Sequence, residues 1–431
     1  MRKNKISIVD CLLMLLIFLI VSCRNNENIS PSLNIIPIEG TIGNYNVLNF
    51  SDFATDIMYI PLETNDSVLL SPQLFQVIYE NEITLILYAT PSGIDNCYMF
   101  DNEGKFLCQI GQRGQGPNDY LQINNVVIHE KLIYLMAWHK ILIYDMTGHL
   151  IENINLQSNI IPEEYRDSSV RRIVPLSKDE FVVTVVDNSR GYPTAFLFET
   201  EKHTVKTIKK YPGSIKIDRL GSAYNGNEIG NMYRYKDEVR IYKPINDTIF
   251  TIDQNTEIKK SFIFEFGKYG LPLSFYERKE DGGGDVFQMI ENTRNFINKY
   301  ISINLIYESN NHLFFKFRFG NHTPEPIEEI SFFGDKYISS IVYGVFNKNT
   351  GEMTLMKQPI KGKLGFKNDI DNGPVIFPHY ISSNNELVTY ISVEEFLDYY
   401  NKIENPTPQM TEVAKNIDLD DNQIVIVAKL K

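Results

Sequence analysis

The chain repeats one short pattern, which consists of an apolar strand, a turn of the form Asp-x-x-Gly and a second apolar strand. The two clearest turns begin at Asp101 and Asp145, 44 residues apart. Asp at the first position and Gly at the last suit a tight connection between antiparallel strands, because Gly accepts a positive φ. Looser copies of the pattern lie at residues 196–205, 249–258 and 345–353. The repeat predicts a series of antiparallel hairpins.

These hairpins predict an all-β fold, a six-bladed β-propeller with short helical insertions. Ile, Val, Tyr, Phe and Thr dominate the apolar segments, which favours strands. Repeats of about 40–50 residues made of strands are typical of propellers, with one four-stranded sheet per blade. Five hairpins account for five blades, and we expect strands 56–61 and 423–430 to form a sixth that closes the ring. Apolar spacing predicts helical insertions at 285–300 and 393–402.

Residues 1–22 have the layout of a secretory signal peptide. A basic start precedes the apolar run 6–21, which Asp10 interrupts, and a serine then precedes Cys23. This order resembles the lipobox of bacterial lipoproteins, which implies that Cys23 is acylated and becomes the new N-terminus. The alternative is an uncleaved transmembrane anchor. A membrane span needs about 20 apolar residues, however, and this run is shorter.

The composition after Cys23 predicts how the rest of the chain is organised and which partners it excludes. Residues 23–45, rich in Asn, Ser, Gly and Pro, are expected to form the lipidated cysteine and a flexible tether. The propeller domain is then expected at 46–431. A net charge of −12 argues against nucleic acid as a partner, because phosphate binding needs clustered Lys and Arg. The membrane is expected to be contacted through the lipid.

Two cysteines flank the first clear turn. If Asp101 faces Gly104 across the turn, Cys97 and Cys108 lie directly opposite each other on adjacent strands. An oxidising compartment permits a disulfide between them. A reduced buried pair is the alternative, since a cross-strand bridge needs suitable geometry.

The order of motifs between residues 110 and 151 resembles an NHL repeat. A Gly-rich stretch with an aromatic residue, Ile110–Tyr120, is followed by two strands and then by the turn at Asp145. Together with the lipobox, the segments 59–64 and 378–381 and the C-terminal strand, this resembles the NHL-like six-bladed β-propeller lipoproteins of Bacteroidota. The resemblance implies a propeller tied to the outer membrane, either periplasmic or surface-exposed. Most members have no assigned activity, so it implies little about mechanism.

Five residues are candidates for contacts with a ligand. Trp138 and His139 lie at a strand connection where an aromatic face could meet a sugar or a peptide side chain; burial of the tryptophan between blades is the alternative. Arg113 and Tyr120 belong to the Gly-rich stretch, which leads into a strand and not into the helix that a dinucleotide site requires. They are expected to brace neighbouring blades or to contact a ligand. His379 lies in one of the family-like segments.

The spacing of the polar residues indicates no particular catalytic chemistry. The seven histidines show no metal-binding spacing, and no G-x-S-x-G motif is present. We therefore expect no metal or cofactor, and a non-catalytic module that binds a carbohydrate, a peptide or an envelope protein. The alternatives are a hydrolase or lyase with its site in the central channel, and a structural subunit of a larger complex.

Overall fold

A computed structural model describes most of the chain from residue 34 onward. The described residues are 34–70, 74–90, 93–137, 140–156, 168–187, 193–201, 204–210, 231–242, 247–272, 292, 295–330 and 336–431. All but the first of them belong to one compact unit, Ile35–Lys431. The predicted signal peptide and Cys23 therefore lie outside the described residues. Within the described part, no helix is long and apolar enough to cross a membrane.

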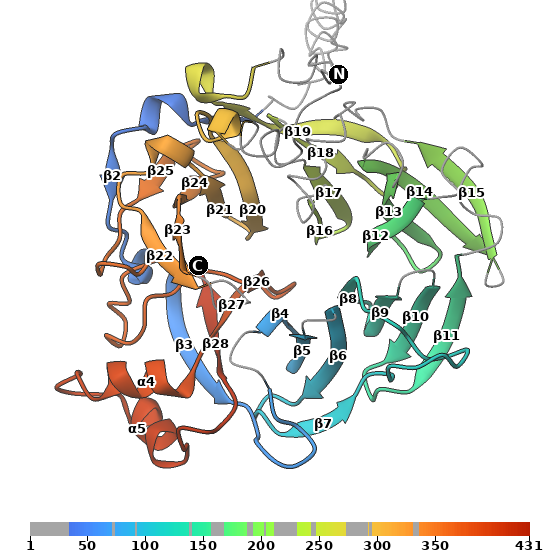
Figure 1. The fold of residues 1–431 in the computed structure, drawn as a ribbon, viewed down its shortest axis with the longest axis horizontal. Helices are drawn as coiled ribbons and strands as arrows, with labels where there is room; N and C mark the ends of the chain where they lie inside the picture. Colours follow the sequence, from blue (N-terminus) through green and yellow to red (C-terminus); the bar gives the residue numbers. More distant parts are fainter. Residues whose placement is uncertain are drawn as a thin grey trace, which may run out of the picture. The chain divides into compact units, whose positions relative to one another are not determined.

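Five largely antiparallel sheets each contain one of the five predicted hairpins, and their first strands face a common centre (Figure 1). The strands of the first three sheets are β4 (Leu74–Glu80), β5 (Ile83–Thr90), β6 (Gly93–Phe100) and β7 (Phe106–Gln109); β8 (Asn125–His129), β9 (Leu132–Ala137), β10 (Lys140–Asp145) and β11 (Leu150–Asn155); and β12 (Ser168–Pro175), β13 (Glu180–Asp187), β14 (Pro193–Glu201) and β15 (Thr204–Lys210).

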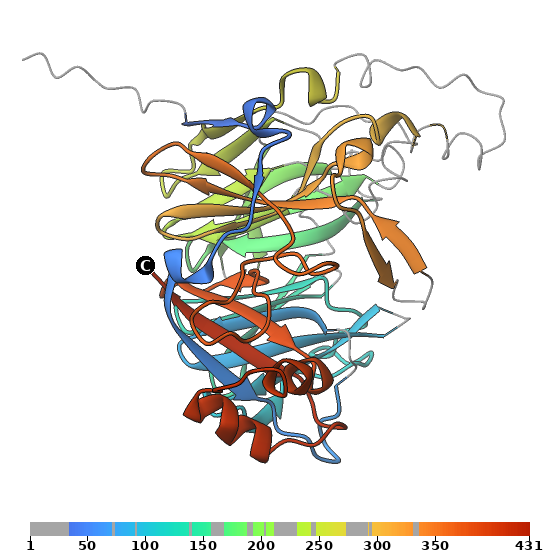
Figure 2. The same ribbon diagram turned by 90° about the vertical axis from the view of Figure 1, so that its left-hand side faces the viewer.

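The fourth and fifth of these sheets gain an extra outer strand from the N-terminal part of the chain. Their strands are β16 (Asn231–Tyr235), β17 (Glu238–Tyr242), β18 (Thr248–Ile252), β19 (Ile258–Glu265) and β1 (Asn34–Pro37); and β20 (Ser302–Glu308), β21 (His312–Arg318), β24 (Ile341–Asn347), β25 (Met353–Met356) and β2 (Tyr45–Asn46). The ribbon β22 (Ile327–Ile330) and β23 (Lys336–Ser339) is inserted between β21 and β24 and stands apart from the sheets (Figure 2).

A further four-stranded sheet, here called the mixed sheet, combines strands from both ends of the chain. It consists of β26 (Tyr380–Ile381), β27 (Glu386–Ile391), β28 (Ile424–Leu430) and β3 (Ala54–Pro61). β3 pairs antiparallel with β28, with Pro61 opposite Ile424, so the predicted pairing of the two ends is confirmed. The fold is thus an all-β propeller with few helices. Six blades were predicted, and five blades made of consecutive strands are established. The mixed sheet is not made of consecutive strands, because its strands come from both ends of the chain.

The folded part begins earlier than the sequence indicated. Residues 34–45 were assigned to the tether, yet β1 forms the outer strand beside β19, and Ile36 and Ile38 have no exposed surface. The average composition of this stretch is polar, but these two isoleucines fill an apolar cluster with Phe262 and Phe264. Burial of two large aliphatic side chains stabilises an ordered strand by several kcal/mol, about 1.5–3 kcal/mol for each.

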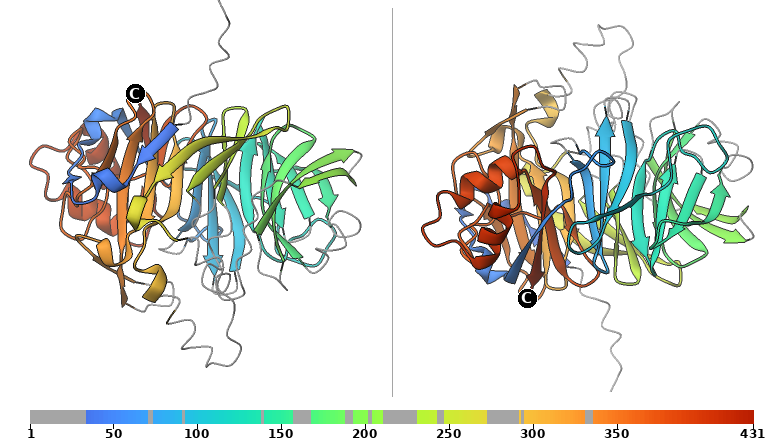
Figure 3. Two further views of the ribbon diagram at one scale, coloured as in Figure 1. Left: turned by 90° about the horizontal axis from the view of Figure 1, so that it is seen from above. Right: turned by 90° about the horizontal axis from the view of Figure 1, so that it is seen from below.

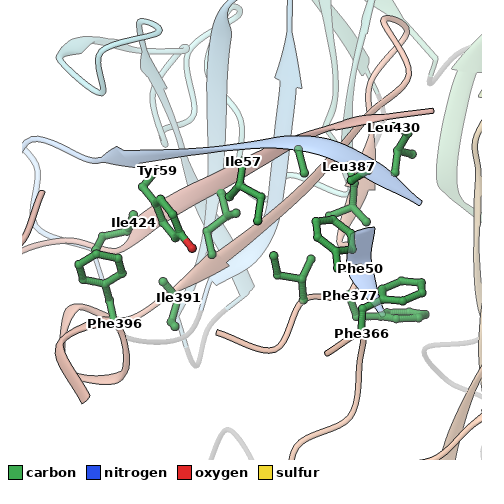
Figure 4. Packing of buried hydrophobic residues seen from close by; sticks show 14 of the residues in the cluster. Phe50, Ile57, Tyr59, Phe366, Phe377, Leu387, Ile391, Phe396, Ile424 and Leu430 are labelled. Carbon is green, nitrogen blue, oxygen red and sulfur yellow. The ribbon is translucent and has the colours of Figure 1, made fainter. Parts of the chain in front are cut away.

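The apolar cores lie between neighbouring sheets. The largest joins the mixed sheet to the sheet of β20, β21, β24 and β25, and Figure 4 shows Tyr59, Phe366, Phe377 and Phe396 packed within it. The segments 285–291 and 293–294 of one predicted helical insertion lie outside the described residues.

The other predicted helix is confirmed as α4 (Val393–Tyr400), and α5 (Pro408–Lys415) follows it. Both helices pack on the outer side of the mixed sheet (Figure 3). The Ser392 hydroxyl of α4 accepts a hydrogen bond from the Glu395 backbone, as an N-cap does.

The predicted alignment of Cys97 with Cys108 is wrong. Phe100 lies opposite Phe106 where the prediction placed Lys105, and a bulge between Met99 and Phe100 shifts the register by one more residue, so Cys108 lies opposite Met99. The sequence shows neither shift, because the Asp-x-x-Gly turn closes through a bond from the Asp101 N–H to the Lys105 carbonyl and the bulge lies beyond the turn. Both thiols are free, Cys97 buried and Cys108 half-buried, and burial raises the pKa of each.

Candidate functional site

The candidates from the Gly-rich stretch lie in a compact connection between two blades. Tyr120 has no exposed surface and packs in the cluster shared by the β4–β7 and β8–β11 sheets. Its backbone N–H donates to the Gln112 carbonyl at 3.0 Å, and Asp119 accepts from the Gly116 N–H at 2.9 Å. Arg113, in contrast, is exposed. Trp138 and His139 lie outside the described residues.

His379 lies beside the first strand of the mixed sheet and is reached by solvent although protein surrounds it. The side chain is exposed, yet desolvation lowers the pKa of His379 to about 4, with Lys316 lowering it further. Its Nδ1 lies 2.8 Å from the Thr389 hydroxyl, and its ring lies 4.9 Å from that of Tyr390. The imidazole is therefore neutral at pH 7, and solvent reaches part of the residue.

Side chains from four sheets gather around Tyr307, and His379 joins them through Tyr390. We call this group the central cluster; its members are Arg172 (β12), Tyr242 (β17), Tyr307 (β20), Tyr343 (β24), His379 and Tyr390 (β27). Burial raises the pKa of Tyr307, and Tyr343, Tyr242 and Tyr390 raise it further, so these phenols lie near one another. All but Tyr242 keep accessible surface.

Packing against the cores holds the aromatic members in place. Tyr343 stacks on Phe377 with ring centroids 3.8 Å apart, and Tyr307 meets the same ring edge-on at 6.5 Å. The Tyr242 hydroxyl accepts a hydrogen bond from the Ile306 backbone N–H at 3.0 Å, which joins two sheets. Because the rings rest on buried neighbours, the surface they present is largely preorganised.

An ion network lies between the β16–β19 sheet and the next one. The Glu308 side chain, 1% exposed, accepts hydrogen bonds from Tyr233 at 2.9 Å, Arg240 at 3.1 Å and Lys348 at 3.1 Å. Arg240 also pairs with Glu238 at 2.7 Å. The carboxylate is thus fully engaged, and its charge is taken up by Arg240 and Lys348.

Glu80 forms a second buried acid group, between the β4–β7 sheet and the mixed sheet. It accepts from the Tyr380 hydroxyl at 2.7 Å and from the Ser383 backbone and hydroxyl groups. Burial raises the pKa of Glu80 even though these three donors lower it. Glu80 therefore holds a proton more readily than an ordinary glutamate does. Among the described residues, no group of three or more His, Cys, Asp or Glu side chains is placed to hold a metal ion.

The sequence pointed to only one member of the central cluster, His379. Arg172 and Tyr307 are 135 positions apart and belong to no motif. A useful signal would have been their position on first strands, because first strands line the centre of a propeller. That assignment was missed since the hairpins, made of third and fourth strands, dominate the repeat.

Solved structures of several bacterial proteins are similar to this chain. A protein of Bacteroides fragilis NCTC 9343, described as exported, is 18% identical; the match covers 92% of this chain and 99% of that one, with a TM-score of 0.63. A member of the DUF4221 family from Bacteroides vulgatus ATCC 8482 is 13% identical, covering 88% and 97%, with a TM-score of 0.45. Virginiamycin B lyase from Staphylococcus aureus is 12% identical, covering 86% and 99%, with a TM-score of 0.41.

At these identities the first of the structures supports the fold alone, and the TM-scores of the other two are too low to carry an argument. No curated protein sequence matches the chain significantly. The family model described as "Domain of unknown function (DUF4934)" matches residues 33–429, which is nearly the whole described unit. The chain therefore belongs to the DUF4934 family.

Proposed function

We propose that this protein is a lipid-anchored propeller of the cell envelope that binds a carbohydrate at the central cluster without converting it. The observation that carries the proposal is the gathering of Tyr307, Tyr343, Tyr390 and His379, all reachable by solvent, at one place. Aromatic faces held rigidly beside hydrogen-bonding groups suit sugar rings, which present apolar C–H faces and hydroxyl groups. A peptide or an envelope protein could meet the same surface and is an outcome of the tests below.

The proposal includes a closed ring in which the mixed sheet is the sixth blade. One apolar cluster joins the mixed sheet to the β4–β7 sheet, and another joins it to the sheet of β20, β21, β24 and β25. The other clusters join the successive sheets in chain order. A ring of six sheets accounts for all six clusters, and it would fix the relative positions of the side chains at the centre.

A repeated contact also supports this arrangement. The turn at Gly148 rests on Cys108, in the outermost strand of the preceding blade. The turn at Gly104 rests in the same way on Pro61, in the outermost strand of the mixed sheet. The mixed sheet thus stands to the β4–β7 sheet as that sheet stands to the next, which is the relation expected of a blade.

The envelope location rests on the N-terminal sequence and on one structural relative. The lipobox-like order before Cys23 is that of an exported lipoprotein. The similar protein of Bacteroides fragilis is described as exported. We propose that Cys23 is acylated and that the lipid holds the propeller at the outer membrane.

Acylation can be measured directly. In cells fed an alkyne-labelled fatty acid, the full-length chain is expected to acquire the label and to fractionate with membranes. The Cys23→Ser variant is expected to lose both properties, because the thioether bond to the lipid cannot form. Cys108→Ser is the matched control, since its thiol lies in the folded domain. Equal labelling of wild type and Cys23→Ser would contradict lipid attachment at this residue.

Binding can be tested with the full-length protein in detergent on a glycan array, followed by calorimetry with the best glycans. We expect saturable binding that Tyr307→Ala weakens by about tenfold, because the loss of a ring face removes roughly 1–1.5 kcal/mol of contact. Tyr337→Ala, on the exposed strand β23, is expected to leave affinity unchanged. Absence of binding to every glycan, or equal effects of the two variants, would contradict the proposed site.

A hydrolase or lyase is the second candidate function. The observation that favours it is Glu80, whose raised pKa suits a proton donor. Glu80 accepts a hydrogen bond from Tyr380, the residue that follows His379 in the sequence. The discriminating measurement is product formation from any glycan that binds. Turnover abolished by Glu80→Gln would replace the binding proposal with this one.

A further inference from the structure

We propose that Arg172 is an anion-recognition residue of the central cluster, so that the ligand is an acidic carbohydrate bearing a carboxylate or a sulfate. This inference deepens the proposed function and depends on it. It adds a chemical class of ligand and one residue that selects it.

The Arg172 side chain is enclosed by protein but keeps some accessible surface. It lies in β12, the innermost strand of its sheet, which contacts the innermost strands β8 and β16 of the two neighbouring sheets. The next residues, Ile173 and Val174, are buried in the clusters on the two sides of the sheet. A bulge between Val170 and Arg172 interrupts the register, and the Arg172 side chain keeps accessible surface. Bulges re-aim side chains in this way.

The guanidinium of Arg172 has no carboxylate partner among the described residues. The groups that act on its charge are the phenols of Tyr242 and Tyr307, and burial lowers the pKa of Arg172. Other enclosed arginines are paired. Arg240 binds Glu308 and Glu238, and Arg234 donates to two backbone carbonyls and lies 3.6 Å from Asp237. An enclosed cation without a counter-ion is costly, and an anionic ligand would offset that cost.

The nearest acid network is already in use. Glu308 follows Tyr307 in the chain, but both its oxygens are engaged by Tyr233, Arg240 and Lys348. The charge that acts on His379 is that of Lys316, again a cation. Arg172 and Lys316 thus both place positive charge beside members of the cluster, although the whole chain carries −12.

The neighbouring groups suit a sugar that carries an anion. A guanidinium binds a carboxylate or a sulfate through two parallel hydrogen bonds. Burial keeps the Tyr307 phenol protonated, so it can donate a hydrogen bond to the same anion. The residues Tyr343 and Tyr390 lie near Tyr307 and keep accessible surface, so their rings can contact the face of the sugar. One cation beside several aromatic faces matches an acidic sugar unit better than a neutral one.

The test compares matched ligands on the full-length protein by calorimetry. The probes are trigalacturonic acid, its neutral methyl ester and a sulfated disaccharide. We expect the wild type to bind at least one of the two anionic probes about tenfold or more tightly than the methyl ester, since hydrogen bonds to charged groups contribute about 1.5–3 kcal/mol. Preference for the carboxylate or for the sulfate identifies the source of the anion.

Variants at arginine assign the effect to a residue. Arg172→Gln is expected to remove the preference for the anion, so that the acidic probe loses about tenfold in affinity and the methyl ester loses less. Arg172→Lys is expected to retain part of the preference, because charge remains but the paired geometry is lost. Arg113→Gln, the same change at an exposed position in the Gly-rich connection, is the control and is expected to keep wild-type preference.

The outcomes separate this inference from the proposed function. Equal binding of acidic and neutral probes by the wild type would overturn the role of Arg172 and leave carbohydrate binding intact. If the protein binds neither these probes nor any other glycan, both the role of Arg172 and the proposed carbohydrate binding are overturned. Should Arg172→Gln fail to fold, as judged by circular dichroism, the comparison of probes on the wild type and on Arg172→Lys still decides.

Discussion

Glu308→Gln is expected to lower the free energy of unfolding by about 3–5 kcal/mol, the usual cost of breaking one side of a buried ion pair. The Glu308 side chain is 1% exposed, and Arg240 and Lys348 each bind one of its two oxygens at 3.1 Å. Glutamine preserves the shape but removes the charge, so two enclosed cations lose their shared counter-ion. Urea denaturation followed by circular dichroism measures the change, with the slope of the transition as a check on two-state behaviour.

The matched control for this prediction is Glu328→Gln. Glu328 also pairs with a lysine, Lys336, at 2.6 Å, but the two side chains are 57% and 69% exposed. Exposed pairs contribute about 0–1 kcal/mol because water and salt screen them. Glu328→Gln, in the β22–β23 ribbon, should therefore change the free energy of unfolding little, whereas Glu308→Gln, between the sheets, should lower it strongly. Equal losses in the two variants would show that burial is not what gives the Glu308 network its importance.

The contrast between these two glutamates also explains what could be predicted from the sequence. The hairpins were predictable because alternation and an Asp-x-x-Gly turn act over about ten residues. Glu308, Arg240 and Lys348 are each ordinary charged residues in the sequence, and only the packing of two sheets brings them together. Pairings of this range leave no local pattern, so the ion network had no sequence signal.

The errors have equally specific causes. Ile36 and Ile38 were assigned to the tether because polar neighbours dominate their window, although both are fully buried. The opposition of Cys97 and Cys108 failed through two single-residue shifts, one at the turn and one at a bulge beyond it, and each shifts every later pair of the hairpin. Of the ligand candidates, His379 lies in the central cluster and Tyr120 within a core. Arg172 was missed because its enclosure depends on three sheets.

The second large effect is expected at Gly104, where the β6–β7 turn meets the mixed sheet. Its φ is +82°, and a Cβ built there would lie 2.0 Å from the Pro61 carbonyl oxygen. Gly104→Ala must therefore strain the turn and also displace a backbone that pairs with β28. Left-handed backbone costs a non-glycine residue roughly 1–2 kcal/mol, and overpacking adds about 1–3 kcal/mol. We expect a total loss of about 2–5 kcal/mol in urea denaturation.

Two other glycines with similar backbones divide this loss into its parts. Gly351, in the β24–β25 turn, has φ +74° and nothing within 4 Å of a built Cβ, so Gly351→Ala should cost only the backbone strain. Gly148 has φ +83° and faces the Cys108 Sγ at 2.5 Å, a side chain that can move aside, so Gly148→Ala should fall between. This order, Gly104 then Gly148 then Gly351, is expected only if hairpin turns lock each blade onto its predecessor. Similar losses at Gly104 and Gly351 would contradict a structural contact between the first blade and the mixed sheet, and with it the sixth blade of the proposed ring.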